Sequence, residues 1–212
     1  MLLLGLDTAT PTVTVAVGDG STVLARRDLR PGATGGAAAP SGAAADAPIR
    51  RRAPSPRHGE LLAPAVRDVL AEAGVGPGDL THVVCGVGPG PFTGVRVGVV
   101  TARVLGLTLG VPVVGVCSLD GLAAAAGSPC LAVIDARRRE VYVAAYDAAG
   151  HRTWGPRVVR PGDLPALLAT DLAAGPGSAP RLAVGPGAQL YAEVLAAAGR
   201  QVGDPAEVEA TT

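Results

Sequence analysis

The sequence predicts an α/β fold made of two similar lobes, each beginning with a β-hairpin. A hairpin-like pattern occurs twice, at residues 2–17 and 131–146, and each copy carries an aspartate at the same place. Strand-like runs elsewhere lead through glycine- and proline-rich turns into helical patterns, a succession typical of α/β proteins. We place the N-terminal lobe at residues 1–116 and the C-terminal lobe at residues 117–212.

The two hairpins align without a gap. With the aspartates Asp7 and Asp135 superimposed, the alternating valines that follow them also coincide, and alternation of this period is typical of half-buried strands. Each aspartate is expected either to cap its turn by accepting backbone N–H groups or to face a metal ion or water beside a phosphate.

A first helix is predicted over residues 58–72. Its apolar residues recur at the spacing of an amphipathic helix. Leu61, Ala65 and Val69 form one stripe, and Leu62 lies beside it.

The most distinctive stretch joins a strand-like run at residues 81–85 to a helical pattern at residues 93–109. Glycines and prolines between them fix a tight turn, which is either purely structural or presents backbone N–H groups to an anion. The common phosphate loops are not matched, because all 18 basic residues are arginine and the GxGxxG spacing ends in Thr93. A second turn of this kind is predicted at Gly185–Gly187.

Small residues recur at every fourth position of the second predicted helix. Glycine inside a helix costs about 1 kcal/mol relative to alanine, so a close approach of another backbone is expected to compensate. The stripe packs either against the sheet of its own lobe or against a helix of a partner chain. Its members are Gly94, Gly98, Ala102 and Gly106.

Residues 31–56 are rich in alanine, glycine and proline and have no hydrophobic period, which predicts a flexible surface insertion. It ends with Arg50–Arg52, for which contact with RNA is an alternative to simple solvation. A second run, Arg137–Arg139, fills the turn of the second hairpin and is expected to be exposed.

The composition disfavours a protein that binds nucleic acid without a partner, because the net charge is +0 and aromatic residues make up only 2%.

Cys85, Cys117 and Cys130 share no metal or redox spacing and are expected to be buried in a reducing compartment. The N-terminus lacks the basic segment of a signal peptide. Two arginines in the second predicted helix argue against a membrane span, so we expect a cytoplasmic protein.

No catalytic set can be assembled from the sequence. The three histidines are distant from one another, so neither HxxxH nor HExxH metal pairs occur. No GxSxG nucleophile elbow is found, and Schiff-base chemistry would need a lysine. We therefore predict no catalytic residue and no metal site.

Five segments, taken in order, resemble the TsaB (formerly YeaZ) family, a subunit of the bacterial machinery that makes threonylcarbamoyladenosine in tRNA. They are Leu4–Thr10, His58–Pro64, Gly88–Gly98, Gly115–Leu122 and Ile134–Tyr142. These segments span most of the chain outside the insertion, and the Phe-Thr-Gly-Val-Arg block is the most specific of them. The chain departs from the family in having Pro91 where serine is usual, in a longer insertion, and in ending at Thr212 without the usual final helix.

The resemblance implies an actin-like, sugar-kinase-like (ribonuclease H-like) fold and a subunit that is not itself an enzyme. A TsaD-like catalytic partner would transfer the threonylcarbamoyl group to N6 of the adenosine 3′ of the anticodon. A TsaE-like ATPase would join the pair, and tRNA would be contacted only through the complex. No cofactor is expected, although a nucleotide in the interlobe cleft and a homodimer are both left open.

Family members pair through two helices of the N-terminal lobe, which implies the following interface residues here: Leu61, Leu62, Ala65, Val69, Gly94, Val95, Gly98, Ala102 and Gly106. A vestigial nucleotide cleft would use Asp7, Thr8, Thr10, Gly88, Gly90, Thr93, Asp135, Gly185 and Gly187. The competing interpretation is an ATP-dependent small-molecule kinase or ATPase, in which this cleft binds Mg-ATP. A peptidase, an older description of the family, would need a metal or nucleophile set that the sequence does not supply.

Overall fold

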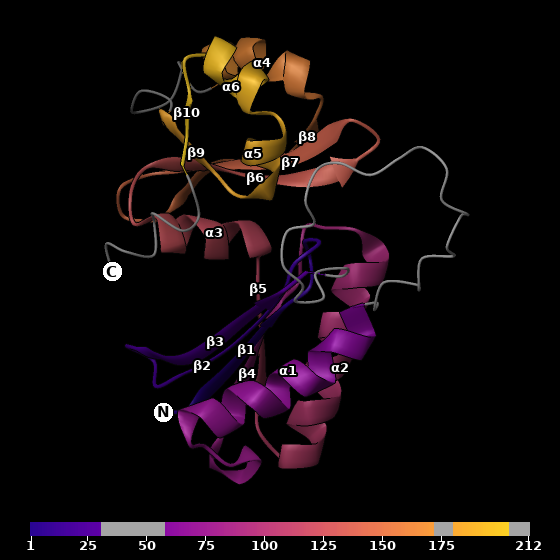
Figure 1. Ribbon diagram of the computed structural model, residues 1–212. Coiled ribbons are helices and arrows are strands. Elements are labelled where there is room, and N and C mark those ends of the chain that lie inside the picture. Colours follow the sequence, from indigo (N-terminus) through magenta and orange to yellow (C-terminus); the bar gives the residue numbers. More distant parts are fainter. Residues whose placement is uncertain (31–57, 172–179, 204–212) are drawn as a thin grey trace, which may run out of the picture.

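The computed structural model describes residues 1–30, 58–171 and 180–203 and arranges them as two lobes, one above the other (Figure 1). The predicted insertion at residues 31–56, with Arg50–Arg52, and the chain end after residue 203 lie outside the described residues. Each lobe is built on a five-stranded sheet, in the order β3-β2-β1-β4-β5 in the N-terminal lobe and β10-β9-β6-β7-β8 in the C-terminal lobe.

The strands of the N-terminal sheet are β1 (Leu3–Asp7), β2 (Val13–Gly18), β3 (Val23–Leu29), β4 (His82–Gly86) and β5 (Val113–Val116). Those of the C-terminal sheet are β6 (Cys130–Arg137), β7 (Glu140–Tyr146), β8 (Arg152–Val159), β9 (Leu182–Val184) and β10 (Gln201–Val202). The helices are α1 (His58–Ala73), α2 (Phe92–Leu109), α3 (Ser118–Ala126), α4 (Leu164–Asp171), α5 (Pro186–Leu190) and α6 (Ala192–Ala197).

The two sheets share one topology. In each, the first strand pairs antiparallel with the second and parallel with the fourth: β1 with β2 and β4, and β6 with β7 and β9. The duplicated hairpins predicted from the sequence are therefore confirmed, and so is the two-lobed α/β class. The hairpins differ by one residue in pairing, because Asp7 lies opposite Thr14 whereas Asp135 lies opposite Val141. A bulge between Asp135 and Arg137 accounts for this shift.

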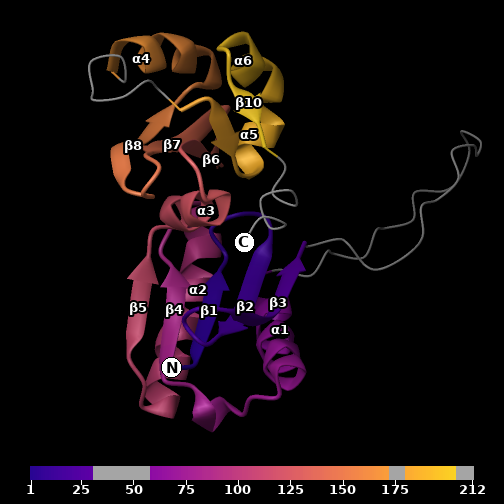
Figure 2. The same cartoon turned by 90° about the vertical axis from the view of Figure 1, so that its left-hand side faces the viewer.

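Both helices of the N-terminal lobe cover the same face of its sheet. Alternate residues of β1 and β2, such as Leu4 and Val15, meet Leu62 and Val69 of α1 in one core, as the period of two in strands requires. Figure 2 shows the sheet from its other side, with α1 and α2 behind it. The long α2 ends at Gly110, whose φ of 68° is the left-handed conformation of a C-cap glycine. Both helices agree with the predicted ranges to within one residue.

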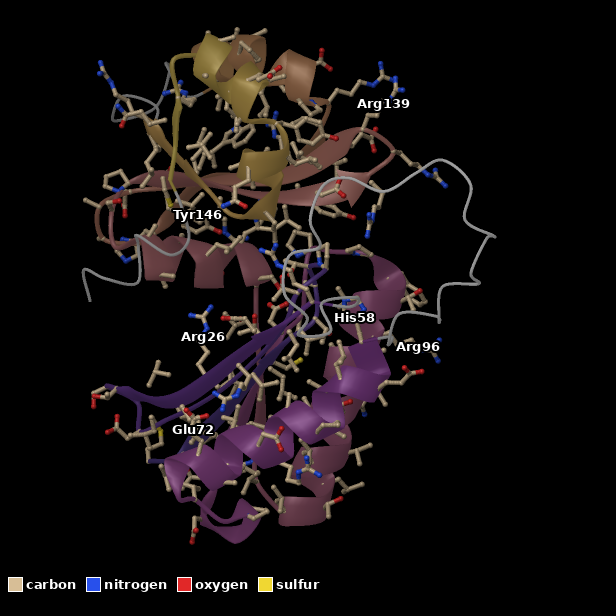
Figure 3. The ribbon with its side chains drawn as sticks, in the orientation of Figure 1. Arg26, His58, Glu72, Arg96, Arg139 and Tyr146 are labelled. Atoms are coloured by element: carbon tan, nitrogen blue, oxygen red, sulfur yellow. The ribbon has the colours of Figure 1, made fainter. Side chains whose placement is uncertain are left out.

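The C-terminal sheet is packed on both faces. One face carries a core shared with α4, α5 and α6, and the other packs against Leu119 and Ala123 of α3. The hydroxyl of Tyr146, in the core against α3 (Figure 3), donates a hydrogen bond of 2.6 Å to Asp120 Oδ1. Since α3 follows β5 directly and packs under the second sheet, it forms the junction between the lobes.

Candidate functional site

The stripe of small residues on α2 packs against the sheet of its own lobe. Gly94, Gly98, Ala102 and Gly106 are all buried within the chain. A Cβ atom at Gly94 or Gly98 would lie 2.5 Å from the carbonyl oxygen or the hydroxyl of Thr8, respectively. The assignment of this stripe to a partner interface is therefore wrong, because Thr8, directly after β1, and Val113 of β5 already fill the space that a partner helix would need.

Three of the four predicted interface residues of α1 are also part of the core. Leu62, Ala65 and Val69 are at most 2% exposed and pack against the sheet, so they too are unavailable to a partner. Leu61 and Val95 are only partly buried and remain candidates. The error has one cause: an amphipathic stripe identifies the buried face of a helix but does not say which chain buries it.

The opposite face of α2 carries large apolar side chains in solvent. Phe92 is 78% exposed, Val100 50%, Val104 57% and Leu107 86%. Arg96 lies among them, and its guanidinium group stands 5.9 Å from the centre of the Phe92 ring. By length and composition alone α2 could also cross a membrane, and its apolar exposed face is one reason that it meets this criterion.

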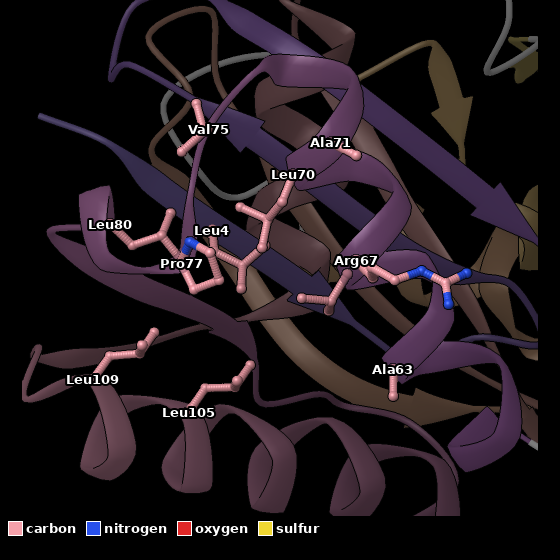
Figure 4. Close-up of a pocket in the computed structure, with 11 residues that line it drawn as sticks. Leu4, Ala63, Arg67, Leu70, Ala71, Val75, Pro77, Leu80, Leu105 and Leu109 are labelled. Atoms are coloured by element: carbon pink, nitrogen blue, oxygen red, sulfur yellow. The ribbon is translucent and has the colours of Figure 1, made fainter.

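A groove of about 380 Å³ runs between α1 and α2 (Figure 4). Side chains of both helices form its walls, and the loop after α1 closes one end. The lining is apolar except for one arginine: Leu4, Ala63, Val66, Arg67, Leu70, Ala71, Val75, Pro77, Leu80, Leu105 and Leu109. The groove and the exposed side of α2 together form a surface that we call the α1/α2 face.

The first aspartate of the repeat lies at the junction between the lobes, with both carboxylate oxygens engaged. Asp7 Oδ1 accepts a hydrogen bond of 2.6 Å from the backbone N–H of Ala9, and Oδ2 accepts one of 2.6 Å from the hydroxyl of Ser118. The backbone of Gly88 exchanges hydrogen bonds with Ser118, through its N–H at 3.3 Å and its carbonyl at 2.8 Å. A side chain at Gly86 would collide with the Asp7 carboxylate. This network joins β1 to the start of α3.

The glycines of the predicted nucleotide cleft lie where a side chain would collide with the protein's own backbone. A Cβ at Gly90 would meet the carbonyl oxygen of Ala9, and one at Gly187 would lie 2.9 Å from backbone carbons of β6. Gly185 has a φ of 98°, and a Cβ added there would lie 2.7 Å from the carbonyl oxygen of Val133. Gly88 also adopts a positive φ, of 90°. Close packing and turn geometry therefore account for these glycines without a phosphate group.

Polar residues of this predicted cleft are engaged in hydrogen bonds within the protein. The Thr8 hydroxyl donates to the carbonyl of Gly94, and the Thr10 hydroxyl donates to that of Thr12. Asp135 accepts the backbone N–H of Arg137, whose guanidinium group lies 3.6 Å from the same carboxylate. Thr93 is exposed on the first turn of α2.

Removing the Ser118 hydroxyl should loosen the junction. We expect Ser118→Ala to lower the free energy of unfolding by about 1–3 kcal/mol, because it leaves an oxygen of the partly buried Asp7 without its donor. Urea unfolding followed by circular dichroism measures the change. The control is Ser128→Ala, since that hydroxyl bonds only the carbonyl of nearby Ala126 and should cost less than about 0.5 kcal/mol. Equal effects of the two variants would contradict the role of Ser118.

The buried thiols are poor nucleophiles. Burial raises the pKa of Cys85, and that of Cys130, to about 11, so the thiolate forms only at strongly alkaline pH. We expect iodoacetamide at mildly alkaline pH to alkylate the partly buried Cys117 first, and the other two only after unfolding in urea. Peptide mass spectrometry checks this order, and equal labelling of all three in the folded protein would refute it.

Within the described ranges, no three His, Cys, Asp or Glu side chains are grouped so that they could hold a metal ion. His58 Nε2 instead lies 3.0 Å from the carbonyl oxygen of Thr10 and joins α1 to the first hairpin turn. The geometry thus offers a binding surface on α1 and α2 and a hydrogen-bonded lobe junction.

The chain is similar to one known protein family and to several known proteins. A family model described as "TsaD: tRNA N6-adenosine threonylcarbamoyltransferase" matches residues 52–173. An uncharacterized protein of Mycobacterium tuberculosis is 40% identical over 101 residues, which cover 48% of this chain and 47% of that protein. One of Mycobacterium leprae is 38% identical over 119 residues, which cover 56% of this chain and 33% of that protein. The chain thus spans less than half the length of these curated relatives.

Two solved structures from Pseudomonas aeruginosa are similar over nearly the whole chain. One is described as an uncharacterized protein with similarity to peptidase YeaZ, with 29% identity, a TM-score of 0.65 and coverage of 91% of this chain and 79% of that one. The other is YeaZ, with 27% identity, a TM-score of 0.64 and coverage of 92% and 81%.

Proposed function

Because the chain belongs to the TsaD family of tRNA N6-adenosine threonylcarbamoyltransferases, in its TsaB (YeaZ) group, we propose that it is the accessory subunit of this tRNA-modifying system. In this role it pairs with a TsaD-like catalytic subunit and activates it. A TsaE-like ATPase joins the pair in the cytoplasm, and the chain itself performs no catalytic step.

The α1/α2 face is the observation that carries the proposal. Covering apolar surface with a partner gains about 25 cal/mol of free energy for each Å² removed from water. Contiguous exposed patches of large apolar side chains therefore mark interaction sites. Phe92, Val104 and Leu107 are such side chains, and the groove between α1 and α2 can receive side chains of a partner helix. A subunit of the same family would present two comparable helices, so the faces can pack as a pseudo-symmetric pair.

The lobe junction supports a non-catalytic role. An ATP-dependent kinase of this fold would need the Asp7 carboxylate for a magnesium ion, whereas both of its oxygens here accept protein hydrogen bonds. A peptidase would need an activated nucleophile, and burial suppresses ionisation of Cys85 and Cys130. No specific observation favours either alternative.

The test is reconstitution with the TsaD-like protein of the same organism. We expect a 1:1 heterodimer by size-exclusion chromatography with light scattering, and transfer of the threonylcarbamoyl group to tRNA that requires this chain. A homodimer that gives way to the heterodimer would use the same face. If both proteins are folded and no complex forms, the proposal fails.

A further inference from the structure

The turn between β6 and β7 holds three consecutive arginines in the left-handed backbone conformation. Arg137, Arg138 and Arg139 have φ values of 66°, 52° and 62°, and within the described part of the chain no other non-glycine residue has a positive φ. Because Arg137 lies opposite Glu140, the loop is the two-residue connection Arg138-Arg139. Such loops adopt primed turns that strongly favour Asn-Gly. Arginine disfavours this left-handed conformation, so the backbone of the turn is strained. Backbone strain of this kind is found at functional sites.

These side chains form a cationic surface at one end of the C-terminal sheet. All three arginines of the turn are exposed, and Figure 3 shows Arg139 at the outer edge of the lobe. Val159 pairs with Val141, so the next residue, the exposed Arg160, lies at the level of Glu140 beside the turn. We call Arg137, Arg138, Arg139 and Arg160 the basic turn.

The nearby acids do not neutralise the basic turn. Asp135 is 18% exposed and lies 3.6 Å from the guanidinium group of Arg137, which itself stays 63% exposed. Glu140 is partly buried. Four arginines thus face solvent beside two recessed carboxylates and the exposed Asp163, which closes the turn after Arg160, on a chain whose net charge is +0. The charge at this end of the sheet is a local feature and not a consequence of overall composition.

We infer that the basic turn contacts phosphate groups of the tRNA backbone when the chain is assembled with its partners, an inference that rests on the proposed function. The guanidinium group binds phosphate oxygens through two parallel hydrogen bonds. Four arginines alone give only weak, sequence-independent binding, with a Kd of about 10⁻⁴ M or weaker at physiological salt. In a complex the same contacts add to those of the catalytic subunit, because the RNA is already held nearby.

The double variant Arg138→Asn/Arg139→Gly separates charge from backbone strain. It removes two positive charges and supplies the residues that the turn prefers. We expect the reconstituted heterodimer to bind an unmodified tRNA transcript about tenfold more weakly, with a salt dependence reduced by roughly one to two released counterions. The melting temperature of the variant should stay the same or rise by a few degrees. Weaker tRNA binding together with undiminished stability supports the inference.

Single variants provide a matched control. Arg138→Gln should weaken tRNA binding about threefold, since one phosphate contact is lost. Arg181→Gln should leave it unchanged, because this exposed arginine precedes β9, whose Leu182 pairs with Cys130 at the opposite end of β6. Equal losses for the two variants would indicate a general charge effect and overturn the inference.

Pairing is measured first, by size-exclusion chromatography, so that a failure to pair can be distinguished from a loss of contact with tRNA. If the double variant pairs normally and binds tRNA as the wild type does at low and physiological salt, the inference is wrong while the proposed function stands. If it loses affinity for the ATPase subunit instead of tRNA, the surface belongs to a protein partner and the inference is again wrong. If the wild type does not pair, the proposed function fails. In that case the inference is tested by filter binding of tRNA to the isolated chain at low salt. Weaker tRNA binding by the double variant than by the wild type supports the inference, and unchanged binding overturns it.

Discussion

A leucine at Gly98 will prevent the N-terminal lobe from folding stably, although leucine is the better helix former. The first atom of any side chain at this position would lie 2.5 Å from the hydroxyl of Thr8. That hydroxyl donates to the carbonyl of Gly94 at 2.7 Å and accepts the N–H of Gly98 at 3.0 Å. A leucine must push α2 away from β1, which we expect to cost about 4 kcal/mol or more, a large fraction of the stability of a domain.

Alanine at the same position gives a graded version of this test. Gly98→Ala should lower the free energy of unfolding by about 1–3 kcal/mol through overpacking, measured by urea unfolding. The control is Gly121→Ala in α3, where an added Cβ meets nothing within 4 Å and should stabilise the helix by up to about 1 kcal/mol. If both alanines stabilise the protein, α2 does not pack closely on Thr8.

The hydrophobic period of the sequence predicted the helices and strands well, but it did not predict which of them pack against one another. The repeated hairpins and the helices α1 and α2 have patterns that only one secondary structure fits. The small residues of α2, in contrast, occur at a spacing that suits a sheet of the same chain and a helix of another chain equally well. The choice depends on where Thr8 lies, and that position is set by tertiary structure.

The features of the candidate site that sequence reasoning missed have no local signal. Ser118 and Asp7 are 111 residues apart, so no short motif connects them. Most of the surface of α2 is apolar, and its exposed stripe therefore cannot be distinguished from its buried one by hydropathy. Arg138 and Arg139 were expected to be exposed, but the turn lacks the Asn-Gly signature that would have predicted its left-handed backbone.

An aspartate at Leu107 will strongly weaken pairing with the catalytic subunit while leaving the chain folded. Leu107 is 86% exposed, so the substitution should lower the free energy of unfolding by only about 1 kcal/mol, through the poorer helix propensity of aspartate and its charge in the last turn of α2. In the proposed complex the same carboxylate would be buried against a partner helix without a counter-charge, a cost of several kcal/mol. We expect the Kd of the heterodimer, measured by isothermal titration calorimetry, to rise by at least about 100-fold, as for a residue at the centre of an interface.

Leu190→Asp is the matched control, since this helical leucine of the C-terminal lobe is 60% exposed and lies outside the α1/α2 face. It should leave the Kd unchanged. Comparison with Gly98→Leu distinguishes loss of the interface from loss of the fold. Only the glycine variant should also lose its folded circular dichroism spectrum. If Leu107→Asp and Leu190→Asp both pair like the wild type, the partner binds elsewhere, and the exposed apolar side of α2 needs another explanation.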